Sequence, residues 1–166
     1  MQRQVLVIYD IEEGVFIDVI AGYKSDLLFR DQDRLDLDIL RAKIDPLRLP
    51  LGLNRVGKVN DTIDQSVRLP KVGPIHFLNW NRLSFVWLDP SYEDWDVKKS
   101  RLVDYLILSD DVDVDLTKLR EDFKFTQLII SANCSWKYAR EIATKCRDLN
   151  LAVHNMKEDG YWLLAL

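Results

Sequence analysis

The last third of the chain, residues 102–166, constrains the fold more than any other stretch of the sequence. Its hydrophobic pattern alternates as strand, helix, strand, helix, strand, strand, and a turn signal marks almost every junction. The strands at residues 105–108 and 128–130 are near-continuous apolar runs, which are typical of strands covered on both faces. Shorter strands are expected at residues 152–153 and 161–164. This order predicts a β-α-β-α-β-β segment within a mixed α/β fold.

Both helices of this segment carry signals for their first turns. Asp113 or Asp115 is suited to cap the first helix, which is expected to run to Phe123, and Ser135 is suited to cap the second. The second helix has an apolar stripe that is expected to be buried, formed by Trp136, Ala139, Ile142, Ala143, Cys146 and Leu149.

Residues 4–30 predict an antiparallel meander of three strands, because alternating segments are separated by turn residues. Residues 33–44 fit either a strand or a helix, and a short helix is favoured. In that helix Asp33 would cap the first turn. Pro46 would end it, because the residue before a proline is pushed out of the helical region.

Residues 47–73 show poor hydrophobic periodicity and are punctuated by proline and glycine. Their charged residues are mostly basic, namely Arg48, Arg55, Lys58, Arg68 and Lys71, against Asp61 and Asp64. The segment is interpreted either as a basic loop for phosphates or as a solvated connector with edge strands. The connector is favoured, because runs of charge usually face water.

The next segment predicts a hairpin, with strands at residues 74–78 and 83–88 around a turn at residues 79–82. Aromatic side chains concentrate in and after it, namely Trp80, Trp87, Tyr92 and Trp95. An exposed row of aromatics would stack on nucleic-acid bases. Buried aromatics that stabilise a small sheet are the favoured interpretation.

Length and composition narrow the class of protein. The 166 residues, 48% hydrophobic and 30% charged, are expected to form one soluble domain, 1–166, with a β-rich part over about residues 1–100. The net charge of −4 argues against a generic nucleic-acid binder, although it is compatible with a local basic face. The longest uncharged stretch, residues 125–136, is too short to span a membrane. Cys134 and Cys146 would lie about 18 Å apart along one helix, too far for a disulfide.

No self-sufficient catalytic motif is present in the sequence. His76 and His154 are the only histidines, and their segments suit packed or edge positions better than metal ligation. An acidic run matches ligand spacings of a calcium loop at Asp111, Asp113, Asp115 and Asp122. Leu116, however, stands where the sharp turn of that loop needs glycine, and capping of a helix explains the acidic run.

The chain resembles the carboxy-terminal soluble domain of the ComEC competence family, whose members are membrane channels for DNA uptake. Many of those channels end in a metallo-β-lactamase-like domain with an opening of the form LDVGQGDA. This opening is similar to residues 9–16 here, with Asp10 and Gly14 kept. The closing half is also similar, with a strand at residues 105–109, a helix, a strand ending Ile-Ile-Ser, a second helix, and residues 151–166.

The departures from the family pattern bear on activity. Where the family has the metal-ligand motif HHG, this chain has Asp110, Asp111 and Val112, and the family motif HxHxDH has no counterpart. The resemblance therefore implies a reduced, Bacteroidetes-type member whose degenerate active site has lost its metal ligands. No cofactor is expected, and catalysis is not favoured, because without histidine ligands nothing lowers the pKa of a bound water.

The resemblance implies a non-catalytic accessory or interaction domain of a membrane DNA-uptake protein, on the non-cytoplasmic side of an inner membrane. Its partners would be the membrane-embedded remainder of the parent protein and single-stranded or double-stranded DNA. The candidate contacts to DNA phosphates are Lys137, Arg140, Lys145 and Arg147.

Two alternatives stay open. One is a metal-dependent phosphodiesterase or nuclease with a non-standard carboxylate site, formed by Asp10, Asp110, Asp111 and Asp113. The other is a stand-alone protein-interaction domain unrelated to DNA uptake.

Overall fold

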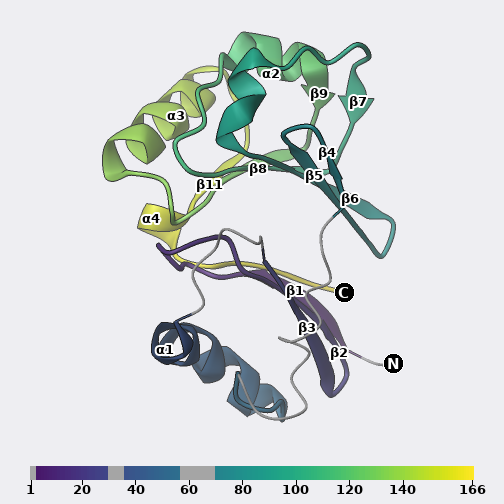
Figure 1. Cartoon of the computed structure of the whole chain (residues 1–166), viewed down its shortest axis with the longest axis vertical. Helices are drawn as coiled ribbons and strands as arrows, with labels where there is room; N and C mark the ends of the chain where they lie inside the picture. Colours follow the sequence, from purple (N-terminus) through teal and green to yellow (C-terminus); the bar gives the residue numbers. More distant parts are fainter. Residues whose placement is uncertain (1–2, 30–35, 57–69) are drawn as a thin grey trace. The chain divides into compact units, whose positions relative to one another are not determined.

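The computed structural model describes residues 3–29, 36–56 and 70–166, and the chain divides into two compact units. The first unit contains Met1–Arg68 and Gly160–Leu166, and the second contains Leu69–Asp159 (Figure 1). Both units combine helix with sheet, which confirms the mixed α/β class. The expectation of a single domain stays a prediction.

The first unit is built on an antiparallel sheet. Its strands are β1 (Gln4–Ile8), β2 (Ile17–Ala21), β3 (Lys24–Leu28) and β12 (Trp162–Ala165), in the order β12-β1-β2-β3. The pairing of β1 with β2 and of β2 with β3 confirms the predicted meander. β12 comes from the other end of the chain and pairs with β1, so that Val5 lies opposite Ala165.

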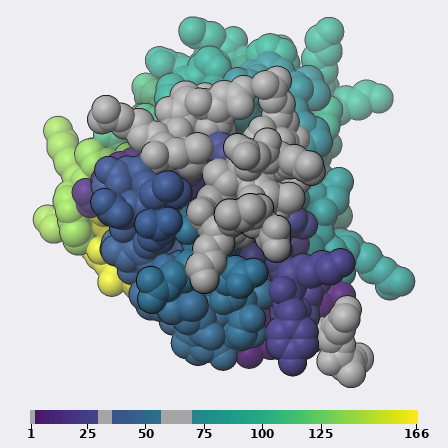
Figure 2. Space-filling view, turned by 60° about the horizontal axis from the view of Figure 1, so that its bottom comes forward, coloured from purple at the N-terminus to yellow at the C-terminus, as the bar shows by residue number. Residues whose placement is uncertain are grey.

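A single α-helix among the described residues of this unit, α1 (Leu37–Arg48), packs against the sheet through Leu40 and Ile44. Figure 2 shows its outward surface in blue. Asp36 caps the helix by accepting hydrogen bonds from two backbone N–H groups of the first turn. The predicted helix is confirmed, whereas Asp33, the predicted cap, lies outside the described residues.

The predicted end of α1 before Pro46 is wrong, because the helix continues through this proline to Arg48. A proline inside a helix removes one hydrogen bond and costs about 3 kcal/mol. Here the last turn is held by Arg48, whose side chain is fully buried and ion-paired. The short helix η1 (Leu49–Leu51) follows, and Gly52 ends it with a left-handed φ of 75°.

The second unit is built on a mixed sheet of six strands. These are β4 (Lys71–Val72), β5 (Ile75–Trp80), β6 (Leu83–Leu88), β8 (Tyr105–Leu108), β10 (Gln127–Ile130) and β11 (Val153–Asn155), in the order β11-β10-β8-β6-β5-β4. The neighbours from β11 to β6 pair in parallel, and β5 and β4 continue the sheet antiparallel. The helices α2 (Leu116–Asp122) and α3 (Trp136–Asp148) lie on the same face of this sheet (Figure 1).

The core under these helices contains strand residues such as Leu108 and Ile130 together with Leu119 of α2 and Ile142 of α3. The predicted order of the main strands and helices in the last third of the chain is therefore confirmed, with two short additions, the strand at Phe123–Lys124 and the helix at Met156–Asp159. The pattern did not show that the two last strands belong to different sheets, since β11 joins this sheet and β12 joins the first unit.

The helix caps agree with the sequence, because Asp115 caps α2 and Ser135 caps α3. The predicted stripe of α3 is wrong at its two ends, where Trp136 and Leu149 are exposed. A helix of 13 residues is roughly 20 Å long, whereas strands of four residues span only about 13 Å, so its ends extend past the strands. Both cysteines are free thiols, as predicted.

The predicted hairpin is formed by β5 and β6 around Asn81 and Arg82, whose φ angles of 48° and 68° are left-handed. Trp87 and Tyr92 are buried, as the favoured interpretation expected, whereas Trp95 is exposed. The remaining elements are the short helices η3 (Pro90–Asp94) and α4 (Met156–Asp159) and the paired strands β7 (Arg101–Leu102) and β9 (Phe123–Lys124).

Candidate functional site

Parallel strands of the second unit end at one edge of the sheet, here called the carboxyl edge, and polar residues stand there. Asp89 follows β6, Ser109 follows β8, Ser131 follows β10, and Asn155 ends β11. All of them are buried. Because ligands of open α/β sheets bind outside the carboxyl ends of the strands, this edge is the first candidate site.

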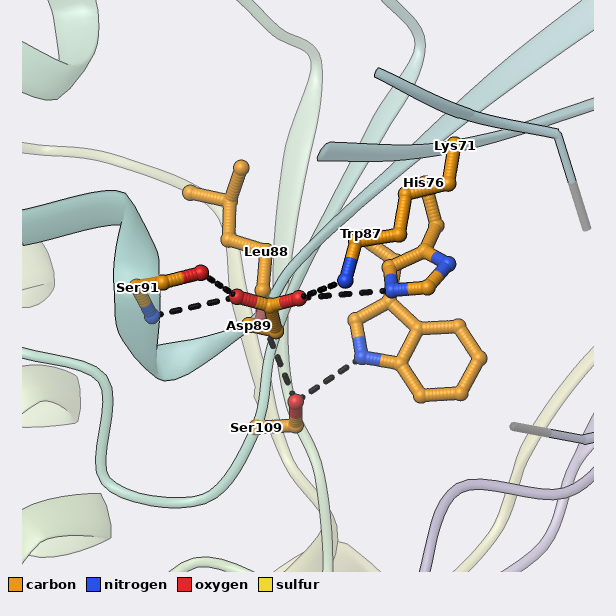
Figure 3. A network of polar contacts seen from close by, with 7 residues as sticks. All are labelled: Lys71, His76, Trp87, Leu88, Asp89, Ser91 and Ser109. Carbon is orange, nitrogen blue, oxygen red and sulfur yellow. Dashed lines mark hydrogen bonds and ion pairs between the residues drawn. The ribbon is translucent and has the colours of Figure 1, made fainter. Parts of the chain in front are cut away.

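Asp89 is the centre of a polar network at the carboxyl edge (Figure 3). Its Oδ2 lies 2.7 Å from Nζ of Lys71 and 3.6 Å from Nε2 of His76. Its Oδ1 accepts hydrogen bonds from the backbone N–H and the hydroxyl of Ser91. Burial raises the pKa of Asp89, but the hydrogen bonds from Lys71 and Ser91 outweigh it and hold the pKa below its ordinary value. The charged carboxylate thus connects β4 and η3 with the end of β6.

Ser109 extends this network to β8. Its Oγ accepts a hydrogen bond of 2.8 Å from Nε1 of Trp87 and donates one of 3.1 Å to the carbonyl of Leu88 (Figure 3). A nucleophilic serine needs an adjacent base to take its proton. Here the proton is directed to a backbone carbonyl, and His76 faces Asp89 instead. Through Ser109 the network joins the ends of β6 and β8.

Asp110 and Asp111 take left-handed backbone conformations directly after β8, with φ angles of 54° and 53°. Oδ1 of Asp110 accepts a hydrogen bond of 2.8 Å from the side-chain amide of Asn133. Oδ1 of Asp111 accepts one of 2.6 Å from the backbone N–H of Ser135, at the start of α3. Such conformations are strained in residues other than glycine and are frequent at functional sites. Here the carboxylates connect two loops at the carboxyl edge.

The predicted carboxylate metal site is distributed over both units. Asp10 belongs to the first unit and forms an ion pair with Lys43 at 3.0 Å, whereas Asp110, Asp111 and Asp113 belong to the second. Over residues 3–29, 36–56 and 70–166, no group of three or more His, Cys, Asp or Glu side chains could hold a metal ion. The carboxylate site stays a prediction. At the acidic run that matches the spacings of a calcium loop, Leu116 starts α2 and its side chain is buried.

The predicted DNA contacts lie on α3, and the structure gathers most of them on one exposed surface. A shallow hollow, here called the α3 hollow, is lined by Trp136, Lys137, Arg140, Glu141, Thr144 and Lys145. The Trp136 side chain is 53% exposed, and Nζ of Lys157 lies 5.7 Å from the centre of its ring. A flat aromatic ring beside several cations can hold a base next to a phosphate chain.

Arg147 stands apart from the α3 hollow. Its guanidinium lies 3.5 Å from the carboxylate of Glu158, next to the last turn of α3. The structure thus brings Lys137, Arg140 and Lys145 together and leaves out the fourth predicted contact. Trp136 was assigned to the buried stripe, so its place in this hollow was missed. Its position at the first residue of the helix was the available signal.

The less favoured interpretation of residues 47–73, a basic loop for phosphates, fails at Arg48. Arg48 belongs to α1 and is fully buried against Asp18, so it cannot bind a phosphate from solvent. Arg55 lies 4.0 Å from Asp45, and Lys71 belongs to β4 and pairs with Asp89. Lys58, Asp61, Asp64 and Arg68 lie outside the described residues.

The fold and site define a mixed α/β domain with a structural polar network and an exposed basic and aromatic helix. The sequence model of the ComEC C-terminal domain matches residues 6–166, so the chain belongs to the ComEC C-terminal domain family. This membership connects the chain with DNA uptake in competence and with a membrane-associated protein. No curated protein and no solved structure matches it. Among the residues that the structure describes, no helix is both long and apolar enough to cross a membrane.

Proposed function

We propose that this chain is a non-catalytic accessory domain of a membrane DNA-uptake protein and that it contacts the DNA backbone through α3. The α3 hollow carries the proposal, because Lys137, Arg140 and Lys145 line one exposed surface together with Trp136. Cations so placed neutralise phosphates and release counterions, independently of sequence. Family membership supports DNA as the polyanion.

The proposed absence of catalysis rests on Asp110, Asp111 and His76, whose side chains at the carboxyl edge already contact other residues. Asp110 and Asp111 accept hydrogen bonds from Asn133 and Ser135, and His76 lies against Asp89. Metal-assisted hydrolysis requires open ligands that hold a metal and lower the pKa of its water. The groups that stand where the family motif HHG would be are instead used to join loops.

The proposed partners are the membrane-embedded remainder of the parent protein and DNA, single-stranded or double-stranded. The proposed location is the non-cytoplasmic side of the inner membrane, where incoming DNA is first met. Support for both comes from membership of the family.

The experiment is a titration of labelled DNA with the chain, followed by fluorescence anisotropy at several salt concentrations. Binding that weakens steeply with salt is expected, with a slope of about 0.7–0.9 per neutralised phosphate. The variant Lys137→Gln/Lys145→Gln should bind more weakly and reduce this slope by about 1.5, whereas Arg147→Gln is the matched control and should change little. Absence of binding, or binding that is unchanged from low to moderate salt, would remove DNA contact from the proposal.

A metal-dependent phosphodiesterase is the second candidate, and the left-handed conformations of Asp110 and Asp111 favour it, because such strain concentrates at functional sites. It expects Mn²⁺ to bind at the predicted carboxylates and nuclease activity to be lost in Asp111→Ala. Calorimetric titration with Mn²⁺ and a nuclease assay with the same ion test it. Without heat of binding and without cleavage the candidate fails.

A further inference from the structure

The corner of the second unit formed by β7 and β9 combines cations with an exposed leucine. The two strands pair in parallel, with Leu102 beside Lys124 and Arg101 beside Phe123. Phe123 is buried in the core, so Leu102 and Lys124 share the face that points away from it. Leu102 is 84% exposed, more than any other large hydrophobic side chain described in this unit. A leucine so exposed has no role in the core.

Four exposed cations lie close to this leucine in the chain or beside it in the sheet, and together with it they form what we call the cationic corner: Lys98, Lys99, Arg101, Leu102 and Lys124. All four cations are exposed, and none of them forms an ion pair with another residue that the structure describes. The guanidinium of Arg101 lies 5.3 Å from the ring centre of Phe77, which orders it at the surface. Four acids lie within three residues of these cations in the chain, namely Asp96, Asp104, Glu121 and Asp122. Asp104 accepts hydrogen bonds from Ser84, and Asp122 is buried and accepts one from Tyr92, so that Asp96 and Glu121 are the exposed acids.

We propose that the cationic corner docks on the surface of a bilayer that contains anionic phospholipids. In this arrangement the lysines contact headgroup phosphates, and Leu102 enters the boundary between headgroups and acyl chains. Lysine and arginine stems suit this position, because their methylene groups lie in the apolar layer while their charges stay in water.

Leu102 favours a bilayer over the other polyanions and over a protein. A nucleic-acid backbone would use the cations but would leave the leucine in water, because aromatic rings rather than aliphatic chains stack on bases. A stable protein interface would need a central cluster of buried aromatic or aliphatic anchors. The corner offers one exposed leucine near four exposed cations. It shares no residue with the α3 hollow, so the inference does not rest on the proposed function.

We expect a modest affinity for the bilayer, to which each cation and the leucine contribute separately. Each cation near an anionic surface strengthens binding by about fivefold, and burial of a leucine side chain adds roughly tenfold or more. Such a contact is weak for a free domain. It becomes effective when the domain is tethered near the bilayer, because tethering replaces free concentration with a high effective concentration.

The test is co-sedimentation of the 166-residue chain with vesicles of phosphatidylcholine and phosphatidylglycerol in equal parts, and with vesicles of phosphatidylcholine alone. The chain should bind the anionic vesicles only. Leu102→Ser should weaken binding by about tenfold, and Lys98→Gln/Lys99→Gln by about 25-fold. Because these side chains are exposed, the variants should keep the fold, which circular dichroism verifies.

The controls lie in the first unit. Tyr23→Ser removes a side chain that is 86% exposed, nearly equal to Leu102, and Lys24→Gln removes one exposed cation. Both should bind anionic vesicles as the unsubstituted chain does. The inference is overturned by absence of binding to anionic vesicles, by full binding of Leu102→Ser, or by equal losses in the controls. It is also overturned if the corner variants lose DNA binding rather than vesicle binding.

Discussion

The guanidinium of Arg48 on α1 makes a two-point contact with the carboxylate of Asp18 on β2, deep in the first unit. Nε lies 2.7 Å from Oδ2, and Nη2 lies 3.1 Å from Oδ1. The hydroxyl of Tyr9 donates a third hydrogen bond, of 3.0 Å, to Oδ2. All three side chains are buried. This contact attaches the last turn of α1 to the sheet, which explains why the helix continues beyond Pro46.

The first prediction concerns this pair. Arg48→Met should lower the free energy of unfolding by about 3–5 kcal/mol, because the Asp18 carboxylate would stay buried without its counter-charge. Urea unfolding measured by tryptophan fluorescence gives this value. The double variant Arg48→Met/Asp18→Leu removes both charges and should recover a large part of the loss. If the double variant is as unstable as the single one, the cost comes from lost packing and not from a stranded charge.

The second prediction is a loss of stability at alkaline pH. Burial raises the pKa of Tyr9 and Tyr138 above the usual range for tyrosine, and it raises the pKa of Cys134 to about 12 and of Cys146 to about 11. These groups are neutral in the folded chain and ionise at lower pH in the unfolded chain. A group of this kind stabilises the folded chain fully at pH values below its unfolded pKa. This stability is lost as the pH rises towards the folded pKa.

The expected window begins near pH 8.5, where unfolded thiols ionise, and steepens above about pH 10, where unfolded tyrosines do. Each group lowers the free energy of unfolding by at most about 1.4 kcal/mol per pH unit between its two pKa values. Urea midpoints at neutral pH and near pH 10.5 measure the effect. Tyr138→Phe should reduce the slope of the free energy of unfolding above pH 10 by the contribution of one tyrosine. A free energy that does not change over this pH window would contradict the raised pKa values.

The third prediction separates strain from hydrogen bonding at Asp111. Asp111→Ala loses the hydrogen bond from the N–H of Ser135 and keeps a Cβ at a φ of 53°, where a residue other than glycine is strained by about 1–2 kcal/mol. We expect a destabilisation of about 1 kcal/mol from the lost hydrogen bond, because the strain is the same in both chains. Asp111→Gly loses the same hydrogen bond without the strain, so it should cost less. Equal midpoints in urea for the two variants would mean that the loop relaxes away from its left-handed conformation.

Local signals in the sequence were sufficient for some elements and not for others. Ser135 and Asp115 were predicted as caps because a cap acts on N–H groups two or three residues away. The end of α1 could not be predicted in this way, because the partner of Arg48 is 30 residues distant in sequence. The same holds for β12, whose partner β1 is at the opposite end of the chain.

The candidate site shows the same difference between local signals and contacts of distant residues. Lys137, Arg140 and Lys145 were predicted as a surface because helical spacing alone places them together, and the α3 hollow contains all three. The network around Asp89 was not predicted. It depends on the register of β4, β5 and β6, which brings Lys71 and His76 to one carboxylate. The hydrophobic pattern of each β-strand, taken by itself, contains no information on that register.

The last prediction asks which form of DNA the α3 hollow accepts. Trp136 is half exposed beside Lys137 and Arg140, so we expect its ring to stack on an unpaired base, which a duplex does not offer. Trp136→Ala should weaken binding of a single-stranded oligonucleotide by about 1–3 kcal/mol, which is roughly 5- to 150-fold. Duplex binding, which uses phosphates alone, should change by less than about twofold.

Fluorescence anisotropy with the two forms of one sequence measures both effects at the same salt concentration. Leu149→Ala is the matched control, because Leu149 is also exposed at an end of α3 but lies outside the hollow. If Trp136→Ala weakens the two forms equally, the ring supports the neighbouring cations and does not stack on bases. If it weakens neither form, the hollow binds through its charges alone, and the salt slope then accounts for the whole affinity.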